Sequence, residues 1–145
     1  MDELIQSMKK ALADHFAFYL KSHGFHWNVE GPDFVQLHKL FGMIYEDFYS
    51  SIDQFAEEIR AMEAYAPASF SRFSELTGIQ DEIKILPART MVEKLLTDLE
   101  VVKISLEEAY ELAEQAHNHG LSNFLAERQD KCGKWAWQLR STLKV

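Results

Sequence analysis

Residues 64–89 read AYAPASFSRFSELTGIQDEIKILPAR, and this stretch decides how the rest of the chain can fold. It contains two of the three prolines in the sequence, Pro67 and Pro87, together with a serine-rich run. It leaves room for one short helix near Phe70 to Leu76. A connection of this length is uncommon in a compact domain unless it crosses from one end of the domain to the other. We therefore expect a long crossover here.

The sequence before the crossover has the apolar spacing of two amphipathic helices, with hydrophobic residues mostly three or four positions apart. The first helix runs to about Asn28 and ends at the break Gly31-Pro32. Asp33 is expected to cap the second helix, with Gln36 completing a capping-box pattern. The apolar positions are Leu4, Ile5, Met8, Leu12, Phe16 and Tyr19 in the first helix and Leu37, Leu40, Phe41, Ile44, Phe48, Ile52, Phe55 and Ile59 in the second.

The sequence after the crossover predicts two more helices. Thr90-Met91-Val92-Glu93 has the pattern of a capping box and is expected to open the third helix. The turn His117-Asn118-His119-Gly120 ends it, and the fourth helix runs from about Ser122 to Leu143. The apolar positions of the third helix are Leu95, Leu99, Val102, Leu106 and Leu112.

Two helical hairpins with short turns, joined by one long crossover, predict an all-α fold: a ferritin-like four-helix bundle whose crossover carries a short extra helix. The length of 145 residues is about the usual size of one domain, so we expect a single domain over residues 1–145. Two other arrangements fit the same pattern. One is an up-and-down bundle with a floppy insertion, and the other is a helical module completed by a partner chain.

The composition is that of a folded globular protein, with 47% hydrophobic and 26% charged residues. No stretch approaches the roughly 20 apolar residues that span a bilayer. Met1-Asp2-Glu3 is charged where a signal peptide has its apolar segment, and the single cysteine, Cys132, fits a reducing compartment. We expect a cytoplasmic protein, with Cys132 as a small buried side chain.

The charge of the chain weighs against nucleic acid as a partner. Fifteen Lys and Arg residues against 23 Asp and Glu residues give a formal net charge of -8. DNA is held mainly by neutralising its phosphates, so an acidic chain needs a separate basic patch. The only basic cluster near the start is Lys9-Lys10. An acidic surface suits cations better.

Four residues have the chemistry and spacing of metal ligands: His26, His38, Asp53 and Glu57. Asp53 and Glu57 lie one helical turn apart, so both carboxylates share a helix face, as is common for iron ligands. If the first two helices fold back on each other at the Gly31-Pro32 break, the two imidazoles become neighbours.

The distance along the second helix predicts that these ligands come from two chains. Asp53 lies 15 residues beyond His38, which is about 22 Å at 1.5 Å per residue. One chain cannot close both pairs around one ion, whereas two antiparallel copies of the helix about a twofold axis can. A ferritin-type site within one bundle needs two Glu-x-x-His motifs. The chain has one, Glu114-Gln115-Ala116-His117, so a within-bundle site is not supported.

Three runs surround these ligands: His26-Trp27-Asn28-Val29-Glu30-Gly31-Pro32-Asp33-Phe34, then Leu37-His38, then Asp53-Gln54-Phe55-Ala56-Glu57. With them the chain resembles the Dps family of mini-ferritins. The resemblance covers nearly the whole chain, including the crossover and the run from Ala126-Glu127-Arg128-Gln129 to Trp135-Ala136-Trp137. A His-Trp pair, a second His twelve residues on and an Asp-x-x-x-Glu motif fifteen beyond that form a specific pattern.

The resemblance implies a hollow shell of twelve subunits that oxidises Fe(II) and stores iron as Fe(III) oxide. The implied activity is that of a ferroxidase, an oxidoreductase that uses hydrogen peroxide or oxygen. The implied sites lie across the twofold interface, with His26 and His38 from one subunit and Asp53 and Glu57 from its neighbour as metal ligands and catalytic residues. Trp27 stands where the family has a tryptophan beside the iron, with an electron-donor role and a packing role both open.

The chain departs from the family pattern in three places. Gly42 replaces the usual aspartate one turn after the second His, which removes a carboxylate and costs about 1 kcal/mol of helix stability relative to alanine. Glu46 could supply an oxygen, but at helical spacing it points about 80° away from His38. Glu58 stands where the family commonly has Arg. The lysine-rich tail with which some members condense DNA is absent.

Three functions therefore remain to be separated. We expect an iron-oxidising and iron-storing cage. The alternatives are a stress protein whose main role is to bind and protect DNA, and a cage with an oxidase site impaired by Gly42. His23, one turn before His26, is either an outer partner of the metal site or a surface residue. Trp135 and Trp137 are expected to face different sides of their helix.

Overall fold

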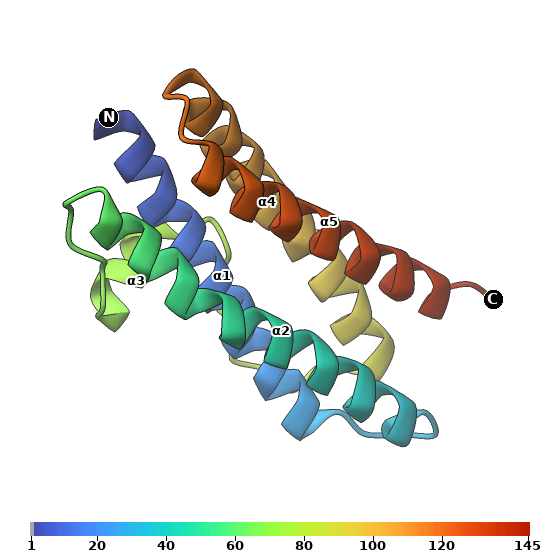
Figure 1. The fold of residues 1–145 in the computed structure, drawn as a ribbon. Helices are drawn as coiled ribbons and strands as arrows, with labels where there is room; N and C mark the ends of the chain where they lie inside the picture. The colour runs from blue at the N-terminus through green and yellow to red at the C-terminus, as the bar shows by residue number, and fades with distance from the viewer. Residues whose placement is uncertain (1) are drawn as a thin grey trace.

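The structure is a computed structural model that describes residues 2–145, and these residues form five α-helices and no strand (Figure 1). The helices are α1 (Asp2–Asn28), α2 (Phe34–Ala61), α3 (Phe70–Leu76), α4 (Ala88–Gln115) and α5 (His119–Thr142). The predicted all-α fold with an extra short helix is confirmed. None of these helices combines the length and the apolar character that a membrane span requires.

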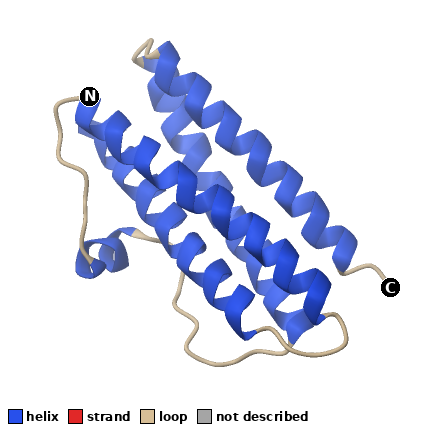
Figure 2. Ribbon diagram, turned by 60° about the horizontal axis from the view of Figure 1, so that its bottom comes forward, coloured by secondary structure: helices blue, strands red, loops and turns tan. Residues whose placement is uncertain are grey.

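The four long helices form two antiparallel hairpins, α1–α2 and α4–α5 (Figure 1). Residues 62–87 join the hairpins, run along the outside of the bundle from one end to the other and carry α3 (Figure 2). This is the predicted crossover. It places α4 beside α1, and the chain termini lie at opposite ends of the bundle (Figures 1 and 2).

Both predicted capping boxes are wrong. Asp33 occupies the N-cap position of α2, but its side chain makes no capping hydrogen bond there. The backbone closes the turn instead, since the amide of Phe34 donates to the carbonyl of Gly31 at 3.1 Å. α4 begins at Ala88, directly after Pro87, so Thr90 lies inside the helix. Proline has the backbone φ of a helix start and needs no amide partner, which explains this earlier beginning.

The turn between α4 and α5 is shorter than the sequence predicts. α5 begins at His119, three residues before the expected Ser122. The side chain of Asn118 accepts a hydrogen bond from the amide of Leu121 at 3.2 Å, which satisfies one of the free amides of the first turn. His117 adopts a left-handed φ of 55° and reverses the chain. His119 and Gly120 are therefore helical residues.

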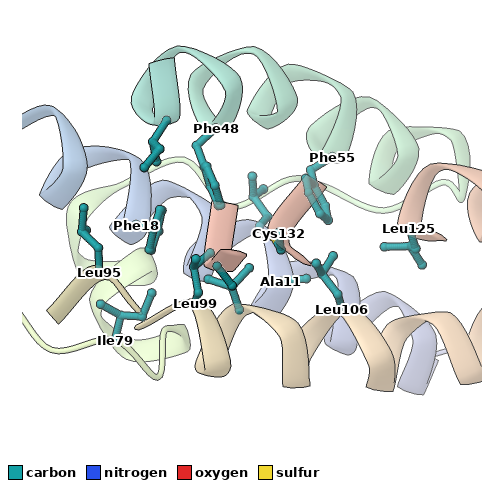
Figure 3. Packing of buried hydrophobic residues seen from close by; sticks show 14 of the residues in the cluster. Ala11, Phe18, Phe48, Phe55, Ile79, Leu95, Leu99, Leu106, Leu125 and Cys132 are labelled. Atoms are coloured by element: carbon teal, nitrogen blue, oxygen red, sulfur yellow. The ribbon is translucent and has the colours of Figure 1, made fainter. Parts of the chain in front are cut away.

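The core lies between the two hairpins, and α2 supplies much of it. Figure 3 shows Phe48 and Phe55 pointing from α2 toward Leu99 and Leu106 of α4. All four side chains are fully buried. Cys132 of α5 is also buried, as expected, and burial raises the pKa of its thiol to about 12. The thiol therefore stays protonated and packs as a small apolar group.

A polar cluster inside the bundle ties α1, α2 and α5 together. Asp47 of α2 accepts hydrogen bonds from Arg128 of α5 at 2.9 Å and from the indole nitrogen of Trp135 at 2.8 Å. The Arg128 Nε atom lies 3.4 Å from Nε2 of His15 on α1, and His15 donates from Nδ1 to the carbonyl of Ala11. Trp135 is half-buried while Trp137 is exposed, so the two indoles do face different sides of α5.

The crossover is held to the bundle by two charged residues of α1. The buried carboxylate of Asp14 accepts from the Thr77 hydroxyl at 2.7 Å and from the amide of Gly78 at 2.8 Å. Lys21 donates to the carbonyl of Gln80 and to the carboxylate of Asp98. Both contacts flank Ile79, which is buried against the core.

Replacing Asp14 with alanine should detach the middle of the crossover. The variant leaves the Thr77 hydroxyl and the Gly78 amide without their acceptor, so we expect a loss of about 2 kcal/mol in the free energy of unfolding. Asp14→Asn is the matched control, because its Oδ1 atom still accepts, and it should lose about 1 kcal/mol or less. Urea unfolding with limited proteolysis of residues 62–87 measures both. An Asp14→Ala protein as stable and resistant as wild type contradicts this anchor.

The stability of the fold should fall below neutral pH because of His15. Burial, and then the charge of Arg128, hold the pKa of His15 well below its ordinary value of 6.5, against a smaller opposing effect of the Ala11 hydrogen bond. The unfolded chain protonates this residue near pH 6.5, so below that pH the unfolded state binds more protons and gains stability. The loss reaches about 1.4 kcal/mol per pH unit for this one group.

Urea unfolding of wild type and His15→Phe at about pH 7 and about pH 5 tests this sign. The free energy difference between the two proteins should shift in favour of the variant at the lower pH, because phenylalanine takes up no proton. His117→Gln, in the exposed α4–α5 turn, serves as the control and should follow wild type. A difference that does not change with pH contradicts a neutral buried His15.

Candidate metal centre

His26 and His38 lie face to face where α1 ends and α2 begins. Their ring centroids are 3.8 Å apart and the ring planes differ by 17°. Nδ1 of His26 lies 2.6 Å from the carbonyl oxygen of His38, and Nδ1 of His38 lies 2.6 Å from the carbonyl oxygen of His26. The two histidines therefore exchange hydrogen bonds across the hairpin, and the sequence argument that made them neighbours is supported.

This exchange determines which ring nitrogen is free in each histidine. A carbonyl oxygen can only accept, so the proton of each neutral imidazole is on Nδ1. The lone pair of each ring is then on Nε2. Histidines that bind metals are commonly oriented by a hydrogen bond from the other ring nitrogen to a carbonyl or carboxylate. In this tautomer Nε2 of each ring is free to bind a metal ion.

The turn between the helices holds the pair in register. Gly31 has a φ of +116°, a conformation that side chains with a Cβ rarely adopt. The amide of Val29 still donates to Phe25 in the last turn of α1, and the Val29 side chain is buried. A short rigid connection with a buried anchor places residue 26 opposite residue 38.

Gly42 lies directly against the ring of His26. A Cβ atom at this position would come within 3.1 Å of both Cε1 and Nδ1 of His26, closer than ordinary van der Waals contact. The missing side chain therefore allows the close approach of an imidazole to α2. Where the sequence pattern indicated a lost carboxylate, the structure has the edge of His26.

The two predicted carboxylates lie toward the other end of α2. Asp53 and Glu57 are both exposed, one turn apart on the same helix. α2 is continuous from Phe34 to Ala61, so the separation of about 22 Å from His38 remains. Within residues 2–145, no group of three or more His, Cys, Asp or Glu side chains could hold a metal ion. One chain thus supplies two imidazoles and two carboxylates at separate places.

Glu46 and Asp47 do not join the histidine pair in this chain. Glu46 is exposed on α2. The carboxylate of Asp47 is engaged by Arg128 and Trp135 in the interior of the bundle. Neither residue replaces a carboxylate at position 42 within the subunit.

His23 is part of an aromatic cluster beside the pair. Its ring stacks on Tyr45 at 3.7 Å with an interplanar angle of 6°, and its Nδ1 lies 3.0 Å from the hydroxyl of Tyr19. The ring of Trp27 also packs against it, with 4.0 Å between the ring centroids. Burial, and then the neighbouring His26, lower the pKa of His23. His23 therefore packs among the aromatic residues that border the histidine pair.

An apolar groove on the outer surface adjoins Asp53. It lies between α1, α2 and the residues around α3, and its lining includes Leu12, Phe16, Ile52, Phe70 and Phe73. Phe16 and Phe73 stack at 4.6 Å on its floor, while Phe70 is 81% exposed. An apolar surface beside an exposed carboxylate is typical of a surface that a partner covers.

Comparison with known proteins identifies the family. The sequence model of the ferritin family, described as a ferritin-like domain, matches residues 5–145. A "DNA protection during starvation protein 2" of Bacillus anthracis is 31% identical, with 97% of each chain covered. The chain belongs to the Dps family.

Solved Dps structures have the same fold. Dps from Staphylococcus aureus matches with a TM-score of 0.95 at 27% identity, over 100% of this chain and 97% of that chain. Dps from Vibrio cholerae matches with a TM-score of 0.94 at 27% identity, over 99% and 90%. The latter is described as a member of a broad superfamily of ferritin-like diiron-carboxylate proteins. The predicted resemblance to Dps proteins is confirmed.

Sequence reasoning missed two features of this Dps chain. The reciprocal hydrogen bonds of His26 and His38 could not be read from the sequence, because a spacing of twelve residues predicts proximity and not ring orientation. The role of Asp47 was missed as well. Its partners Arg128 and Trp135 lie more than 80 residues away in the chain, and no local pattern links them.

Gly42→Ala should weaken metal binding while changing stability little. Alanine gains about 1 kcal/mol of helix propensity, but its Cβ crowds the His26 ring, which must shift by a few tenths of an ångström. We expect the unfolding free energy to stay within about 1 kcal/mol of wild type. Affinity for Co(II), a spectroscopic substitute for Fe(II), should fall about tenfold, as when an orienting contact of a ligand is lost.

Gly24→Ala is the matched control. Gly24 lies in α1 near the same end of the bundle, and a Cβ there meets nothing within 4 Å. This variant should gain up to about 1 kcal/mol in stability and bind Co(II) like wild type. Gly42→Ala could instead gain as much stability as Gly24→Ala and bind Co(II) with wild-type affinity. In that case the close contact between Gly42 and His26 does not influence metal binding.

Proposed function

We propose that this Dps protein is a ferroxidase that oxidises Fe(II) and stores the product as ferric oxide inside a cytoplasmic cage of twelve subunits. Its sites would be formed between subunits, with His26 and His38 from one subunit and Asp53 and Glu57 from its neighbour. The observation that carries the proposal is the pair of stacked imidazoles with free Nε2 atoms, one from α1 and one from α2, together with a carboxylate pair on α2 that is too far away to join them.

A twofold contact between α2 helices brings the two half-sites together. When two copies of a helix pack antiparallel, the start of one lies beside the end of the other, and each contact occurs twice. The apolar groove beside Asp53 supports such a contact, because a second copy would cover it. Each dimer would then contain two equivalent sites.

The ligand chemistry suits Fe(II) as a substrate. Imidazole Nε2 atoms and carboxylate oxygens are donors that bind iron, and the carboxylate charge favours the ferric product. Two Fe(II) ions each give one electron to one hydrogen peroxide molecule. Together with two water molecules they form two ferric oxyhydroxide units and release four protons. The net charge of -8 also favours the approach of cations.

A role in DNA protection is the second candidate, because relatives from Bacillus anthracis and Helicobacter pylori carry that name. The charge of this chain argues against direct DNA binding, since 23 acidic residues outnumber 15 basic ones. A gel shift with duplex DNA at neutral pH separates the two functions. We expect no shift at low salt. A salt-sensitive shift would favour DNA protection over iron oxidation as the main function.

A cage with an impaired oxidase site is the third candidate, and the absence of a side chain at Gly42 favours it. Such a protein would assemble normally and bind iron. Its rate of Fe(II) oxidation would not exceed the rate measured without protein, whereas a working ferroxidase exceeds it. Stopped-flow absorbance with peroxide and with oxygen distinguishes these outcomes and identifies the preferred oxidant.

Mixing two inactive variants tests whether the site is shared. His38→Ala and Asp53→Ala should each abolish Fe(II) oxidation, because each removes one side of both sites in a dimer. Unfolding the two proteins together and reassembling them should restore activity. A mixed dimer has one site with both changes and one intact site, so random mixing restores about a quarter of wild-type sites.

Glu93→Ala is the control for the carboxylate, since Glu93 is also exposed but lies on α4 and not on α2. This variant should oxidise Fe(II) like wild type. If the mixed sample stays as inactive as its two components although wild type survives the same treatment, the ligands do not come from different subunits. Full activity in either single variant would remove its residue from the site.

A further inference from the structure

The turn between α4 and α5 carries two histidines that the proposed iron centre does not use. His117 lies in the turn, and His119 is the first residue of α5. Both side chains are exposed, and their ring centroids are 6.4 Å apart with an interplanar angle of 57°. This turn lies at the opposite end of the bundle from the α1–α2 turn beside His26 and His38 (Figures 1 and 2). Within one subunit the two histidine pairs therefore cannot share an ion.

The separation of the two rings suits a single bound ion. An imidazole nitrogen binds a metal ion at about 2.0 Å and lies about 1.1 Å from the centre of its own ring, so the ring centre is about 3.2 Å from the ion. Two rings on one ion then have centres about 6.4 Å apart when they face each other across it, and about 5.2 Å apart at a tetrahedral angle. The observed separation is at the upper end of this range. Because both side chains are exposed, rotation about their side-chain bonds brings the rings closer.

Neither histidine is required by the fold of the turn. His117 has a φ of 55°, in the left-handed region, where the residue that follows a helix is usually glycine or asparagine. A histidine there costs about 1 kcal/mol of backbone strain relative to glycine. Asn118 caps α5, since its side chain accepts from the amide of Leu121, and His119 takes no part in that bond. The two imidazoles therefore need an explanation other than folding.

The charge around the turn favours a cation. Residues 104–127 contain no Lys or Arg, and the second half of α4 carries Glu107, Glu108, Glu111 and Glu114. The carboxyl end of a helix is also the negative end of its dipole, which attracts positive charge. These carboxylates raise the local concentration of cations but do not complete a ligand set, because no group of three His, Cys, Asp or Glu side chains within residues 2–145 could hold an ion.

We propose that His117 and His119 form a surface site for Cu(II), in which water completes the coordination. Two imidazoles without a carboxylate suit ions late in the first transition series, and Cu(II) binds nitrogen donors more tightly than Fe(II) or Zn(II). The site differs from the proposed iron centre in its place on the subunit and in its ligands, since it has no carboxylate to stabilise a ferric product. It therefore takes a different metal and does not depend on that centre.

Counting bound Cu(II) ions in the assembled protein tests the proposal. Equilibrium dialysis should show that the double variant His117→Asn/His119→Gln binds one Cu(II) ion per subunit fewer than wild type. Asparagine tolerates a left-handed φ, so the variant keeps the shape of the turn. Gln115→Asn is the matched control, because Gln115 is an exposed residue at the end of α4 and has no imidazole. This variant should bind as much Cu(II) as wild type.

Electron paramagnetic resonance identifies the ligands directly. The spin-echo modulation of bound Cu(II) distinguishes one coordinated imidazole from two. His38→Ala is the protein to use, because it removes the competing histidine pair, and less than one Cu(II) per subunit is added. The ion should show two imidazoles. Adding either His117→Asn or His119→Gln should leave one, and should weaken the binding about a hundredfold, because the second imidazole binds in an intramolecular step.

Competition by other ions separates an imidazole site from simple attraction to the glutamates. Mn(II) prefers oxygen ligands and should not displace Cu(II) from the turn, whereas Zn(II) in excess should. If Mn(II) displaces Cu(II) as readily as Zn(II) does, the carboxylates bind the ion and the inference is overturned. It is also overturned if the double variant binds as much Cu(II) as wild type with the same affinity.

The result is independent of the proposed iron chemistry. His117→Asn/His119→Gln should oxidise Fe(II) at the wild-type rate, because neither residue belongs to the iron centre. If wild type does not oxidise Fe(II), the proposed function fails, and the count of Cu(II) ions still decides whether the turn binds copper.

Discussion

The exchange of hydrogen bonds between His26 and His38 is the contact on which the candidate site depends. Each imidazole binds the backbone of the opposite helix, so the same two bonds join α1 to α2 and set the tautomer of both rings. Held at 3.8 Å in a stack, the pair presents two Nε2 lone pairs that need no rearrangement before a metal ion binds.

The rigidity of α2 imposes the second constraint. A helix cannot shorten, and the histidine and carboxylate ends of α2 stay about 22 Å apart whatever the rest of the chain does. A fold that needs both ends at one ion must therefore obtain them from different copies. The apolar groove beside Asp53 also favours association, because part of its lining, including Phe70, is exposed in a single subunit. Ligand geometry and surface chemistry both favour assembly.

The interior of the bundle explains why no metal site of three or more ligands is found within residues 2–145 of one subunit. Asp47 and Arg128 occupy the space between α2 and α5 as a buried ion pair, and His15 is held neutral beside them. The guanidinium group of Arg128 is therefore the cation that pairs with Asp47 between these helices. At Gly42, which is buried on α2, the space that a side chain would take is used by the ring of His26.

The sequence by itself determined the helices, the crossover with its short helix, and the four candidate ligands, because these follow from local spacing and from a fixed rise per residue. It misplaced the starts of α4 and α5, where Pro87 and Asn118 act on single backbone groups. Only the tertiary structure decided the orientation of the two imidazoles, the partner of Asp47 and the contact of Gly42 with His26. Each of these depends on atoms from two helices meeting at close range, and spacing within one helix carries no information about that contact.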